Sequence, residues 1–324
     1  MSSDETLLQI SGLKMYYETL RGWVRAVDDV TLTMQKGDSF GLAGESGCGK
    51  TSIAMSILRL LPSNAKIVDG KIVFENIDIL ALPEEKLRRE IRWKKISAIF
   101  QGAMNSLHPT MPIGKQIAEA ILAHEKVDKK EALERAGKLL DLVGIGAERL
   151  DRYPHELSGG MKQRTMIAMA LACNPDLVIA DEPTTALDVI IEAQVLQVMK
   201  ELQRKLGLSM ILISHDLSII AEICNKVAIM YAGKIVEYGT VVDIYKNPLH
   251  PYTQKLIAAF PSILGRKTEL ASIEGFPPNL LAPPPGCRFH PRCPYATDKC
   301  KKEEPELIDV GKGEQHLVAC HLVG

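Results

Sequence analysis

Residues 44–51 read Gly-Glu-Ser-Gly-Cys-Gly-Lys-Thr, and this stretch decides the fold. It fits the pattern G-x-x-x-x-G-K-[ST] and follows a short apolar segment, Ser39–Ala43. Glycines in such a turn let backbone N–H groups converge on phosphate oxygens, and the dipole of a following helix adds to the attraction. A helical pattern does follow, carrying Ile53 and Ile57 and stopped by Pro62. The order strand, glycine-rich turn, helix therefore predicts a phosphate-binding loop.

Short apolar strands alternate with helical patterns along most of the chain. At 27–34, Val30, Leu32 and Met34 share one face, as in a half-buried strand. Such alternation predicts an α/β layered domain with a mainly parallel sheet, and two consecutive helical patterns within 113–143 predict a helical insertion. The other expected strands are Ile96–Phe100, Leu177–Ala180, Met210–Ser214, Val227–Tyr231 and Lys234–Tyr238, and the expected helices are Ile113–His124, Lys129–Val143, Gly160–Cys173 and Ile190–Leu206.

The composition limits the class of protein. The 324 residues include 39 Lys+Arg and 40 Asp+Glu, which argues against a dominant nucleic-acid-binding surface. A hydrophobic content of 46% excludes a disordered chain. No uncharged apolar run approaches the roughly 18 residues of a membrane-spanning helix, and the start, Met1-Ser-Ser-Asp-Glu5, lacks the regions of a secretory signal. We therefore expect a cytoplasmic protein of about two domains.

Two carboxylates follow the buried segment at 177–180, and ligands in α/β sheets bind at the C-terminal ends of strands. Asp181 suits Mg²⁺, because hard cations prefer oxygen ligands. Glu182 suits polarisation of a water that attacks a phosphate, while Lys50 would reach the β- and γ-phosphates and Thr51 would ligate Mg²⁺. Alone, an Asp-Glu pair is more often a helix N-cap. The phosphate loop is what favours the catalytic interpretation.

Further polar residues lie at the ends of expected strands or helices. Leu157-Ser-Gly-Gly-Met161 opens a helix, with Ser158 as N-cap and two glycines that let backbone amides approach an anion. Gln101 and His215 each follow an expected strand, and Asp188 ends the stretch Thr-Thr-Ala-Leu-Asp. Each of these residues alone is usually an ordinary surface or core residue. Their order along the chain favours a joint site.

With these motifs the sequence resembles the ATP-binding-cassette (ABC) ATPases over about residues 7–245. The resemblance implies a P-loop NTPase core with a mainly parallel sheet, an N-terminal antiparallel β part and a helical subdomain at about 102–165. Two cassettes of this family sandwich ATP, so Ser158 and Gly160 of one chain would complete the phosphate site of the other. Tyr17 is the expected aromatic residue on adenine, with Tyr16 and Trp23 as alternatives.

The same resemblance implies the site residues. Hydrolysis would involve Lys50, Gln101, Glu182 and His215, and Mg²⁺ would be bound by Thr51, Gln101 and Asp181. The implied ATP contacts are Tyr17, Gly44, Glu45, Ser46, Gly47, Cys48, Gly49, Lys50, Thr51, Ser52, Gln101, Ser158, Gly159, Gly160 and Asp188.

A narrower resemblance points to the dipeptide/oligopeptide importer branch of this family. It rests on Phe100–Pro109 and Tyr153–Met161, on Met166–Leu171, and on Asn247–Thr253 with Phe260-Pro261 in a C-terminal extension. Met161 replaces the Gln of the general signature motif, as is common in this branch. Gly102 stands where many members carry an acidic residue. The contact by which the Gln101 loop couples to the membrane subunit is therefore expected to differ in detail.

This branch implies a peripheral protein on the cytoplasmic face of the membrane that hydrolyses ATP to energise peptide import. Its partners would be integral membrane permease subunits and a second ABC ATPase subunit, either a copy of this chain or a homologue. An extracytoplasmic peptide-binding protein would act indirectly, and no nucleic acid is expected. The sequence leaves open whether the cargo is a dipeptide, an oligopeptide or a nickel complex.

Cysteine is unevenly distributed. Cys48, Cys173 and Cys224 are scattered over the first 286 residues, whereas the other four cysteines crowd into the last 38. A proline-rich segment at 248–285 precedes that group and is expected to be an extended connector. We therefore expect a nucleotide-binding domain at 1–245 and a small, irregular, Cys-rich C-terminal extension at 246–324. The four cysteines of the extension are Cys287, Cys293, Cys300 and Cys320.

Four thiolates in the cytosol suit a tetrahedral S₄ site for Zn²⁺ or an iron–sulfur cluster. The C-x₅-C-x₆-C-x₁₉-C spacing lacks the close pairs of a zinc ribbon, and the resemblance implies [4Fe–4S] with Zn²⁺ as the alternative. Free or disulfide-forming cysteines are a further possibility, although the cytosol disfavours disulfides. His290, His316 and His321 lie nearby in sequence and could replace a thiolate as ligand, although we expect each of them at the surface.

A second hypothesis is a soluble, non-transport ABC ATPase, associated with ribosomes or DNA, that carries an iron–sulfur module. Such factors usually have two cassettes in one chain or a long coiled-coil insertion, and this sequence shows neither. A third hypothesis makes the cysteine module a redox sensor that regulates the ATPase.

Overall fold

The computed structural model describes residues 5–185, 187–259, 273–311 and 313–323, which divide into two compact parts. The first part comprises Met1–Leu80 and Ile213–Gly324, and the second comprises Ala81–Leu212. Ala186, within the expected stretch before Asp188, and the Phe260-Pro261 pair lie outside the described residues. The expected domain boundary at about residue 245 stays a prediction. No helix of the described residues combines the length and the apolar character needed to cross a membrane.

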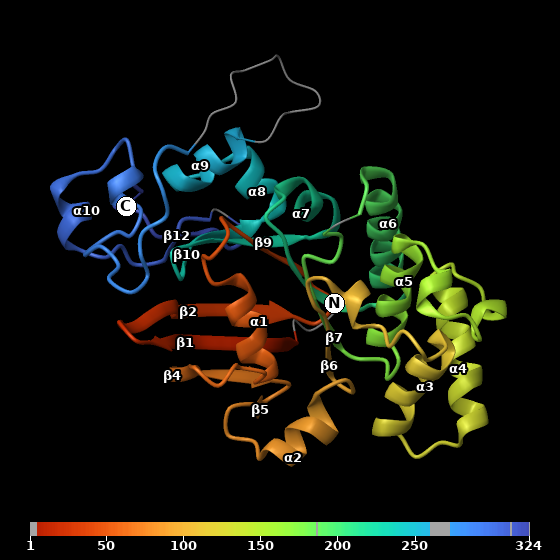
Figure 1. Cartoon of the computed structure of the whole chain (residues 1–324). Helices are drawn as coiled ribbons and strands as arrows, with labels where there is room; N and C mark the ends of the chain where they lie inside the picture. Colours follow the sequence, from red (N-terminus) through yellow and green to blue (C-terminus); the bar gives the residue numbers. More distant parts are fainter. Residues whose placement is uncertain (1–4, 186, 260–272, 312, 324) are drawn as a thin grey trace. The chain divides into compact units, whose positions relative to one another are not determined.

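A four-stranded antiparallel sheet forms the N-terminal portion of the first part, in the order β2-β1-β4-β5 (Figure 1). Val30, Leu32 and Met34 are buried on one face of β2, as the alternation at 27–34 predicts. The strand is longer than expected because it begins at Gly22 and pairs with β1 over most of its length. Its strands are β1 (Thr6–Thr19), β2 (Gly22–Gln35), β4 (Ala65–Phe74) and β5 (Ile77–Asp78).

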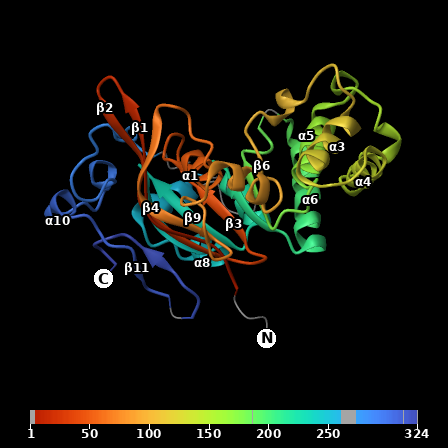
Figure 2. The same ribbon diagram turned by 90° about the horizontal axis from the view of Figure 1, so that it is seen from below.

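The other strands of the first part run in the order β11-β12-β10-β9-β3. All five residues of β3 are buried, and β3 pairs with β9 in parallel, whereas β9 and β10 form an antiparallel hairpin. In Figure 2, β11 is drawn in blue near the C-terminal end of the chain. The strands are β3 (Ser39–Ala43), β9 (Lys226–Tyr231), β10 (Lys234–Thr240), β11 (Ile308–Asp309) and β12 (Leu317–Val318).

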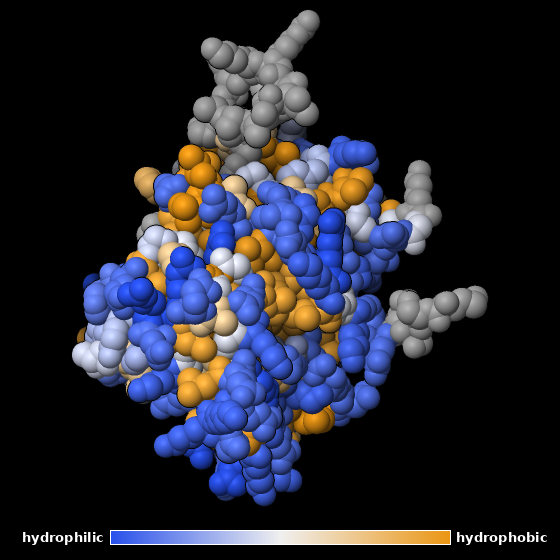
Figure 3. Space-filling model, turned by 90° about the vertical axis from the view of Figure 1, so that its right-hand side faces the viewer, coloured by the Kyte–Doolittle hydropathy of each residue, from blue (hydrophilic) through white to orange (hydrophobic). Residues whose placement is uncertain are grey.

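The second part carries the expected helical insertion. Its strands lie in the order β8-β7-β6, and β6 and β7 are parallel. Helices α3, α4 and α5 pack on one another, and α5 also packs on α6. The face shown in Figure 3 is largely hydrophilic, with apolar side chains in smaller groups. The elements are α2 (Glu84–Lys86), β6 (Ile96–Ile99), α3 (Ile113–His124), α4 (Lys129–Leu142), α5 (Gly159–Ala170), β7 (Leu177–Asp181), α6 (Val189–Leu206) and β8 (Ser209–Ile213).

The remaining helices correct two expectations. The expected extended connector contains a helix, α9, because Pro251 occupies its first turn, where a missing N–H costs nothing. The helix after the phosphate loop, α1, ends at Leu58 because Arg59 adopts φ 49°, before the expected stop at Pro62. The helices of the first part are α1 (Lys50–Leu58), α7 (Leu217–Ile223), α8 (Val241–Lys246), α9 (Pro251–Ala258) and α10 (Asp298–Lys302).

An aromatic cluster fastens the C-terminal extension to the rest of the first part. The Phe289 ring lies with its centroid 5.1 Å from that of Tyr231, 5.4 Å from Tyr252 and 5.7 Å from His250. All four side chains are buried. Aromatic rings in such edge and tilted contacts stabilise a fold beyond the area that they bury. The extension is therefore packed into the core of the first part rather than tethered to its surface.

The burial of His250 predicts how the free energy of unfolding depends on pH. Its Nδ1 accepts a hydrogen bond from the Tyr252 N–H at 3.0 Å, and burial lowers the pKa of His250 to about 3. The unfolded chain takes up a proton near pH 6.5 that the folded chain cannot bind, so stability is lost as the pH falls from about 6.5 towards 3. His250→Asn keeps an N-cap acceptor without the titration. Urea unfolding between pH 5 and 7 should show the free energy of unfolding falling less steeply in the variant, by up to about 1.4 kcal/mol per pH unit. Parallel curves would contradict this assignment.

Candidate active site

The loop between β3 and α1 runs against β2 and β9, two strands from different sheets of the first part. Gly44 and Gly49 have φ angles of 145° and 109°. A Cβ atom on Gly44 would lie 2.2 Å from the carbonyl oxygen of Met230 in β9, and one on Gly49 would lie 2.1 Å from that of Ala26. Only glycine fits both positions, in conformation and in space. The sequence requirement for these glycines is therefore a requirement for close backbone packing.

Lys50 turns its side chain back into this loop. It is buried, and its Nζ donates to the carbonyl oxygens of Gly44 at 2.7 Å and Glu45 at 3.1 Å. Because α1 begins at this residue, the loop offers a helix N-terminus, converging backbone amides and a buried ammonium group to an anion. Burial raises the pKa of the Cys48 thiol, which stays protonated, as expected for an inert side chain. The loop has the features of a phosphate cradle.

The three candidates for contact with an aromatic base differ in their surroundings. The Tyr17 hydroxyl lies 3.2 Å from Ser52 Oγ in the first turn of α1, next to the phosphate loop. The Tyr16 hydroxyl instead donates to Asp28 at 2.6 Å, and burial together with Asp28 raises the pKa of Tyr16 to about 12. Trp23 is exposed on β2. These contacts favour Tyr17.

His215 belongs to the first part, in the segment that follows β8. The preceding Ser214 donates its N–H to the Leu42 carbonyl in β3 at 3.2 Å, which joins this segment to the strand that leads into the phosphate loop. Asp216 caps α7 by accepting the N–H of Ser218 at 2.7 Å. His215 is exposed between these two anchored residues. Its role in hydrolysis stays a prediction.

The second part brings Gln101 and Glu182 together. Asp181 is buried at the end of β7, and Glu182 follows it with φ 46°. Gln101 Nε2 donates to Glu182 Oε2 at 2.8 Å, and Thr185 Oγ1 donates to the same oxygen at 3.1 Å. A left-handed conformation at a non-glycine residue costs on the order of 1–3 kcal/mol and is commonly found at functional sites. The carboxylate is thus held in one orientation beside the Asp181 strand end.

The signature motif, Leu157–Met161, and the Asp188 segment share a neighbour that the sequence did not reveal. Ser158 accepts the Met161 N–H at 3.4 Å as the N-cap of α5, and Asp188 accepts the Ile191 N–H at 3.0 Å as the N-cap of α6. A Cβ atom on Gly160 would lie 2.4 Å from Ile191 Cγ2. Ile191 therefore couples the start of α5 to the start of α6. A tertiary apolar contact of this kind carries no sequence motif.

The expected site residues fall into the two parts of the chain as follows. The first part holds Tyr17, Gly44, Glu45, Ser46, Gly47, Cys48, Gly49, Lys50, Thr51, Ser52 and His215, and the second holds Gln101, Ser158, Gly159, Gly160, Asp181, Glu182 and Asp188.

The four C-terminal cysteines lie in one region of the first part. Cys287 donates its N–H to the Cys300 carbonyl at 2.8 Å. Burial raises the pKa of Cys287 to about 11, and the neighbouring Cys300, Cys320 and Cys293 add to the effect. Among the residues that the structure describes, no group of three or more His, Cys, Asp or Glu side chains is arranged to hold a metal ion. The thiols are neighbours, but the expected Zn²⁺ or cluster site stays a prediction.

Two other expectations for this region are corrected or refined. All seven cysteines are among the described residues and each is free, which agrees with the free-cysteine half of the third possibility and not with its disulfide half. His316 is buried, contrary to the expected surface position, and its Nε2 lies 2.8 Å from Glu237 Oε1. His290 and His321 are hydrogen-bonded to the carbonyl oxygens of Cys287 and Glu303. The three histidines therefore have partners other than a metal.

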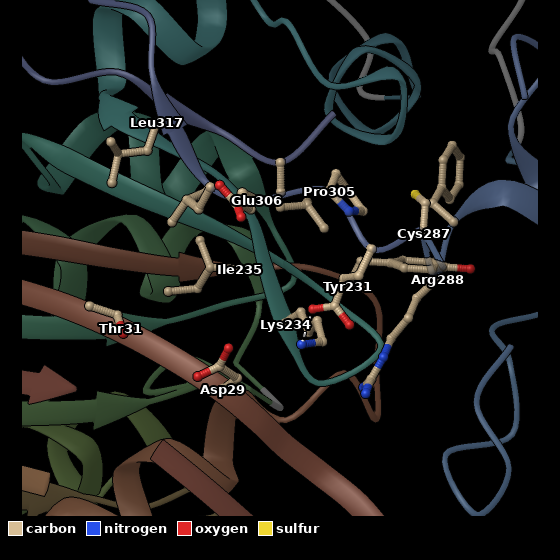
Figure 4. A pocket seen from close by; sticks show the side chains of 15 residues that line it. Asp29, Thr31, Tyr231, Lys234, Ile235, Cys287, Arg288, Pro305, Glu306 and Leu317 are labelled. Atoms are coloured by element: carbon tan, nitrogen blue, oxygen red, sulfur yellow. Dashed lines mark ion pairs between the residues drawn. The ribbon is translucent and has the colours of Figure 1, made fainter. Parts of the chain in front are cut away.

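A cavity of about 500 Å³ lies between β2, the β9–β10 turn and the C-terminal extension. Figure 4 shows Asp29 and Thr31 from β2 on one side and Pro305, Glu306 and Leu317 from the extension on another. Of the expected site residues, only Cys287 lines it. This cavity is thus not the phosphate cradle.

The first part has a glycine-rich loop around a buried lysine, and this loop lies between a buried strand and a helix. This arrangement is typical of P-loop nucleotide-binding proteins. Comparisons with known proteins agree. Residues 27–185 match the family model "ABC transporter", and residues 236–300 match "Oligopeptide/dipeptide transporter, C-terminal region". The solved dimeric post-hydrolysis state of the ATP-binding cassette MJ0796, bound to ADP and Pi, superposes with a TM-score of 0.64 at 25% identity, over 72% of this chain and 99% of that one.

Close relatives extend the match over almost the whole chain. It is 46% identical over 321 residues to the dipeptide transport ATP-binding protein DppD of Bacillus subtilis (strain 168), covering 98% of this chain and 95% of the relative. It is 44% identical over 301 residues to the oligopeptide transport ATP-binding protein OppD of Salmonella typhimurium, covering 92% and 89%. The chain belongs to the ABC ATPases, in the branch of the dipeptide and oligopeptide transport ATP-binding proteins.

The loop geometry predicts an unequal sensitivity of two glycines. Gly47 has φ 78° but no atom within 4 Å of an added Cβ, whereas Gly49 faces the Ala26 carbonyl. Gly47→Ala should lower the free energy of unfolding by about 1–2 kcal/mol, the cost of the backbone conformation alone. Gly49→Ala should cost more than about 3 kcal/mol, because backbone atoms must also move. Denaturant unfolding without nucleotide measures both, and equal losses would contradict the packing argument.

Proposed function

We propose that this chain is the cytoplasmic ATP-hydrolysing subunit of an importer that carries dipeptides or oligopeptides through a separate membrane permease. The observation that carries this proposal is the similarity to peptide-transport ATP-binding proteins over almost the whole chain, C-terminal region included. A ribosome- or DNA-associated ABC ATPase receives no support, because these relatives are transport proteins.

The residues present fit ATP with Mg²⁺. The glycines at 44 and 49 pack closely on backbone carbonyl groups, and Lys50 Nζ points into the loop. The loop therefore has no bulky side chain at either glycine, and its backbone N–H groups can donate to phosphate oxygens. Thr51 and Asp181 supply oxygen ligands of the kind that Mg²⁺ prefers, with Gln101 as the third proposed ligand. Mg²⁺ supplies charge compensation for the phosphates. Tyr17 is proposed to stack on the adenine.

Glu182 is the proposed base for the attacking water. Hydrogen bonds from Gln101 and Thr185 orient its carboxylate, and a positioned carboxylate is what in-line phosphoryl transfer requires from the protein. His215 is proposed to support the same water. Binding of ATP would close two cassettes, with Ser158 and Gly160 of the facing chain on the γ-phosphate, and hydrolysis would reopen them.

The exposed start of α6 supports pairing of two cassettes. Val189 and Ile190 are 80% and 72% exposed directly after Asp188, an unusual position for two large apolar side chains. Covering them by a second cassette removes this apolar surface from water. The partner is proposed to be a second copy of the chain or a homologous ABC subunit. The peptide-binding protein outside the membrane would act through the permease.

A hollow in the second part is the proposed docking place of the permease. The ring centroids of Tyr153 and His155 are 5.7 Å apart in a stacked arrangement at its edge, just before the signature motif. A hollow of this size with an aromatic wall and charged rim suits a short helix of a partner protein. The cavity of about 810 Å³ is lined by Pro109, Thr110, Glu148, Asp151, Arg152, Tyr153, His155 and Glu156.

The C-terminal cysteines are proposed to bind a [4Fe–4S] cluster. Support comes from the closeness of the thiols, since Cys300 and Cys293 add to the raised pKa of both Cys287 and Cys320. The described cysteines are free, and the nearby His316 is engaged elsewhere. Cysteine thiolates are the usual ligands of such clusters. The cluster would supply cross-links within an extension that has little secondary structure of its own.

Replacement of the proposed base gives the central test. Glu182→Gln should leave ATP binding intact and lower the hydrolysis rate by at least about 100-fold, since a positioned base contributes roughly 10²–10⁴ in rate. The variant should also accumulate as a closed dimer in ATP, seen by size-exclusion chromatography. Glu201→Gln is the matched control, because Glu201 is an exposed residue of α6 paired with Lys205. Unchanged hydrolysis in Glu182→Gln would overturn the assignment.

Chemical analysis of anaerobically purified protein tests the cysteine proposal. We expect about four iron and four sulfide ions per chain, and a brown sample that absorbs visible light. Cys300→Ser should lose both the iron and the colour, whereas Cys224→Ser, which removes a buried thiol outside the extension, should keep them. A colourless wild-type protein with one zinc ion per chain would contradict the cluster.

A further inference from the structure

The C-terminal extension contacts the phosphate loop through the side chain of Arg292. This residue ends the 3₁₀ turn His290–Arg292, and its guanidinium meets the carboxylate of Glu45, the second residue of the loop. Nη1 lies 2.7 Å from Oε2, and Nη2 lies 3.0 Å from Oε1. Two parallel charge-assisted bonds fix orientation as well as distance. The ion pair joins residues 247 positions apart in the sequence.

The position of the guanidinium is set by the fold around it. Nε donates to the carbonyl of Glu274 at 2.9 Å, and Nη2 also donates to that of Ile273 at 3.1 Å. Nη1 donates to the Tyr231 hydroxyl at 3.3 Å, and the guanidinium carbon lies 5.7 Å from the centroid of that ring. The Arg292 side chain is only 5% exposed. The extension therefore presents a preorganised cation to Glu45.

Glu45 is held at three points. Arg292 binds its carboxylate, its N–H donates to the Tyr252 hydroxyl at 2.9 Å, and its carbonyl oxygen accepts from Lys50 Nζ at 3.1 Å. Tyr252 and Arg292 both belong to the region after residue 245, and Lys50 is the proposed phosphate ligand. The shape of the loop at Glu45 is thus determined by the extension on one side and by Lys50 on the other.

The charge of Glu45 is a problem for a loop that binds a triphosphate. A carboxylate on a loop that receives phosphate groups repels them, and in a partly buried place this repulsion is poorly screened by water. The Glu45 side chain is only 26% exposed. The ion pair with Arg292 cancels that charge at its source.

We propose that Arg292 is a positioning residue for ATP: it neutralises and holds Glu45, so that the phosphate loop receives the nucleotide without a competing negative charge. This inference rests on the proposed binding of ATP at residues 44–51. It assigns to the extension a direct effect on nucleotide affinity, separate from whatever its cysteines bind.

Equilibrium titration with a fluorescent ATP analogue tests the proposal. Arg292→Ala should weaken binding by about tenfold, because it leaves the Glu45 carboxylate without its counter-charge in a partly buried place. Arg292→Lys retains the charge and should stay within about threefold of the wild type. Lys301→Ala is the matched control, because it removes an exposed cation of the same extension, paired with Asp298, and should not change affinity.

The double variant Arg292→Ala with Glu45→Gln separates charge from structure. If Arg292 acts by cancelling the Glu45 charge, removing both charges should return the affinity to within about twofold of the wild type. If Arg292 only holds the fold, the double variant should bind as weakly as Arg292→Ala or more weakly, and the inference is overturned. Thermal unfolding of each variant without nucleotide reports any loss of structure.

The outcomes also separate this inference from the function on which it rests. A wild-type protein that fails to bind the analogue would overturn the proposed function itself. A wild-type protein that binds it, with Arg292→Ala binding equally well at low salt, would overturn only the role of Arg292. If Arg292→Ala does not fold, the comparison of wild type with Arg292→Lys and with the double variant still decides the question.

Discussion

The structure depends on the contact between the phosphate loop and backbone carbonyl groups of β2 and β9, two strands from different sheets. Because Gly44 lies against Met230 and Gly49 against Ala26, the loop has one path available to it. That path places the first residue of α1 so that the Lys50 side chain turns back into the loop. A larger residue at either glycine would move the lysine, the helix N-terminus and the loop amides together. Packing and chemistry are therefore a single constraint here.

Each part of the chain organises its own share of the chemistry by local hydrogen bonds. In the second part, Gln101 and Thr185 orient Glu182, and Ile191 packs against Gly160 beside the Asp188 cap. These contacts exist without any reference to the other part. Because each set of expected site residues is already ordered within its own part, little reordering of either set is needed when a ligand binds.

The sequence predicts the buried elements well and the half-exposed ones poorly. The strand at 39–43 and the helix at 113–124 have the predicted bounds, because continuous burial or clear helical spacing leaves a strong pattern. β1 and β4 were missed as strands, since register shifts and charged residues interrupt their alternation. The prolines at 248–285 predict extended chain where the structure has α9, because Pro251 occupies the first turn of that helix.

The candidate site also has one component that the sequence indicates and one that it does not. Motif residues such as Lys50 and Glu182 can be proposed for the site from the sequence, because each stands at a fixed place in a short motif. Their supporting contacts are not, because Arg292 and Tyr252 reach Glu45 across more than 200 residues, and no local pattern encodes such a pairing. The buried position of His316 against Glu237 has the same origin.

The short strand β12 has a consequence for the solubility of the protein. It pairs with β10 at Glu237 and Tyr238, and the Ala319 N–H adds a bond to the Val236 carbonyl. Without it, β10 would present a row of unpaired backbone groups, which is a template for strand addition between molecules. The outermost strand in its place, β11, has only two residues and ends in Asp309, a poor template for growth. The C-terminal extension thus protects the sheet from aggregation, and a chain shortened before β12 would lose that protection even if its nucleotide chemistry were unchanged.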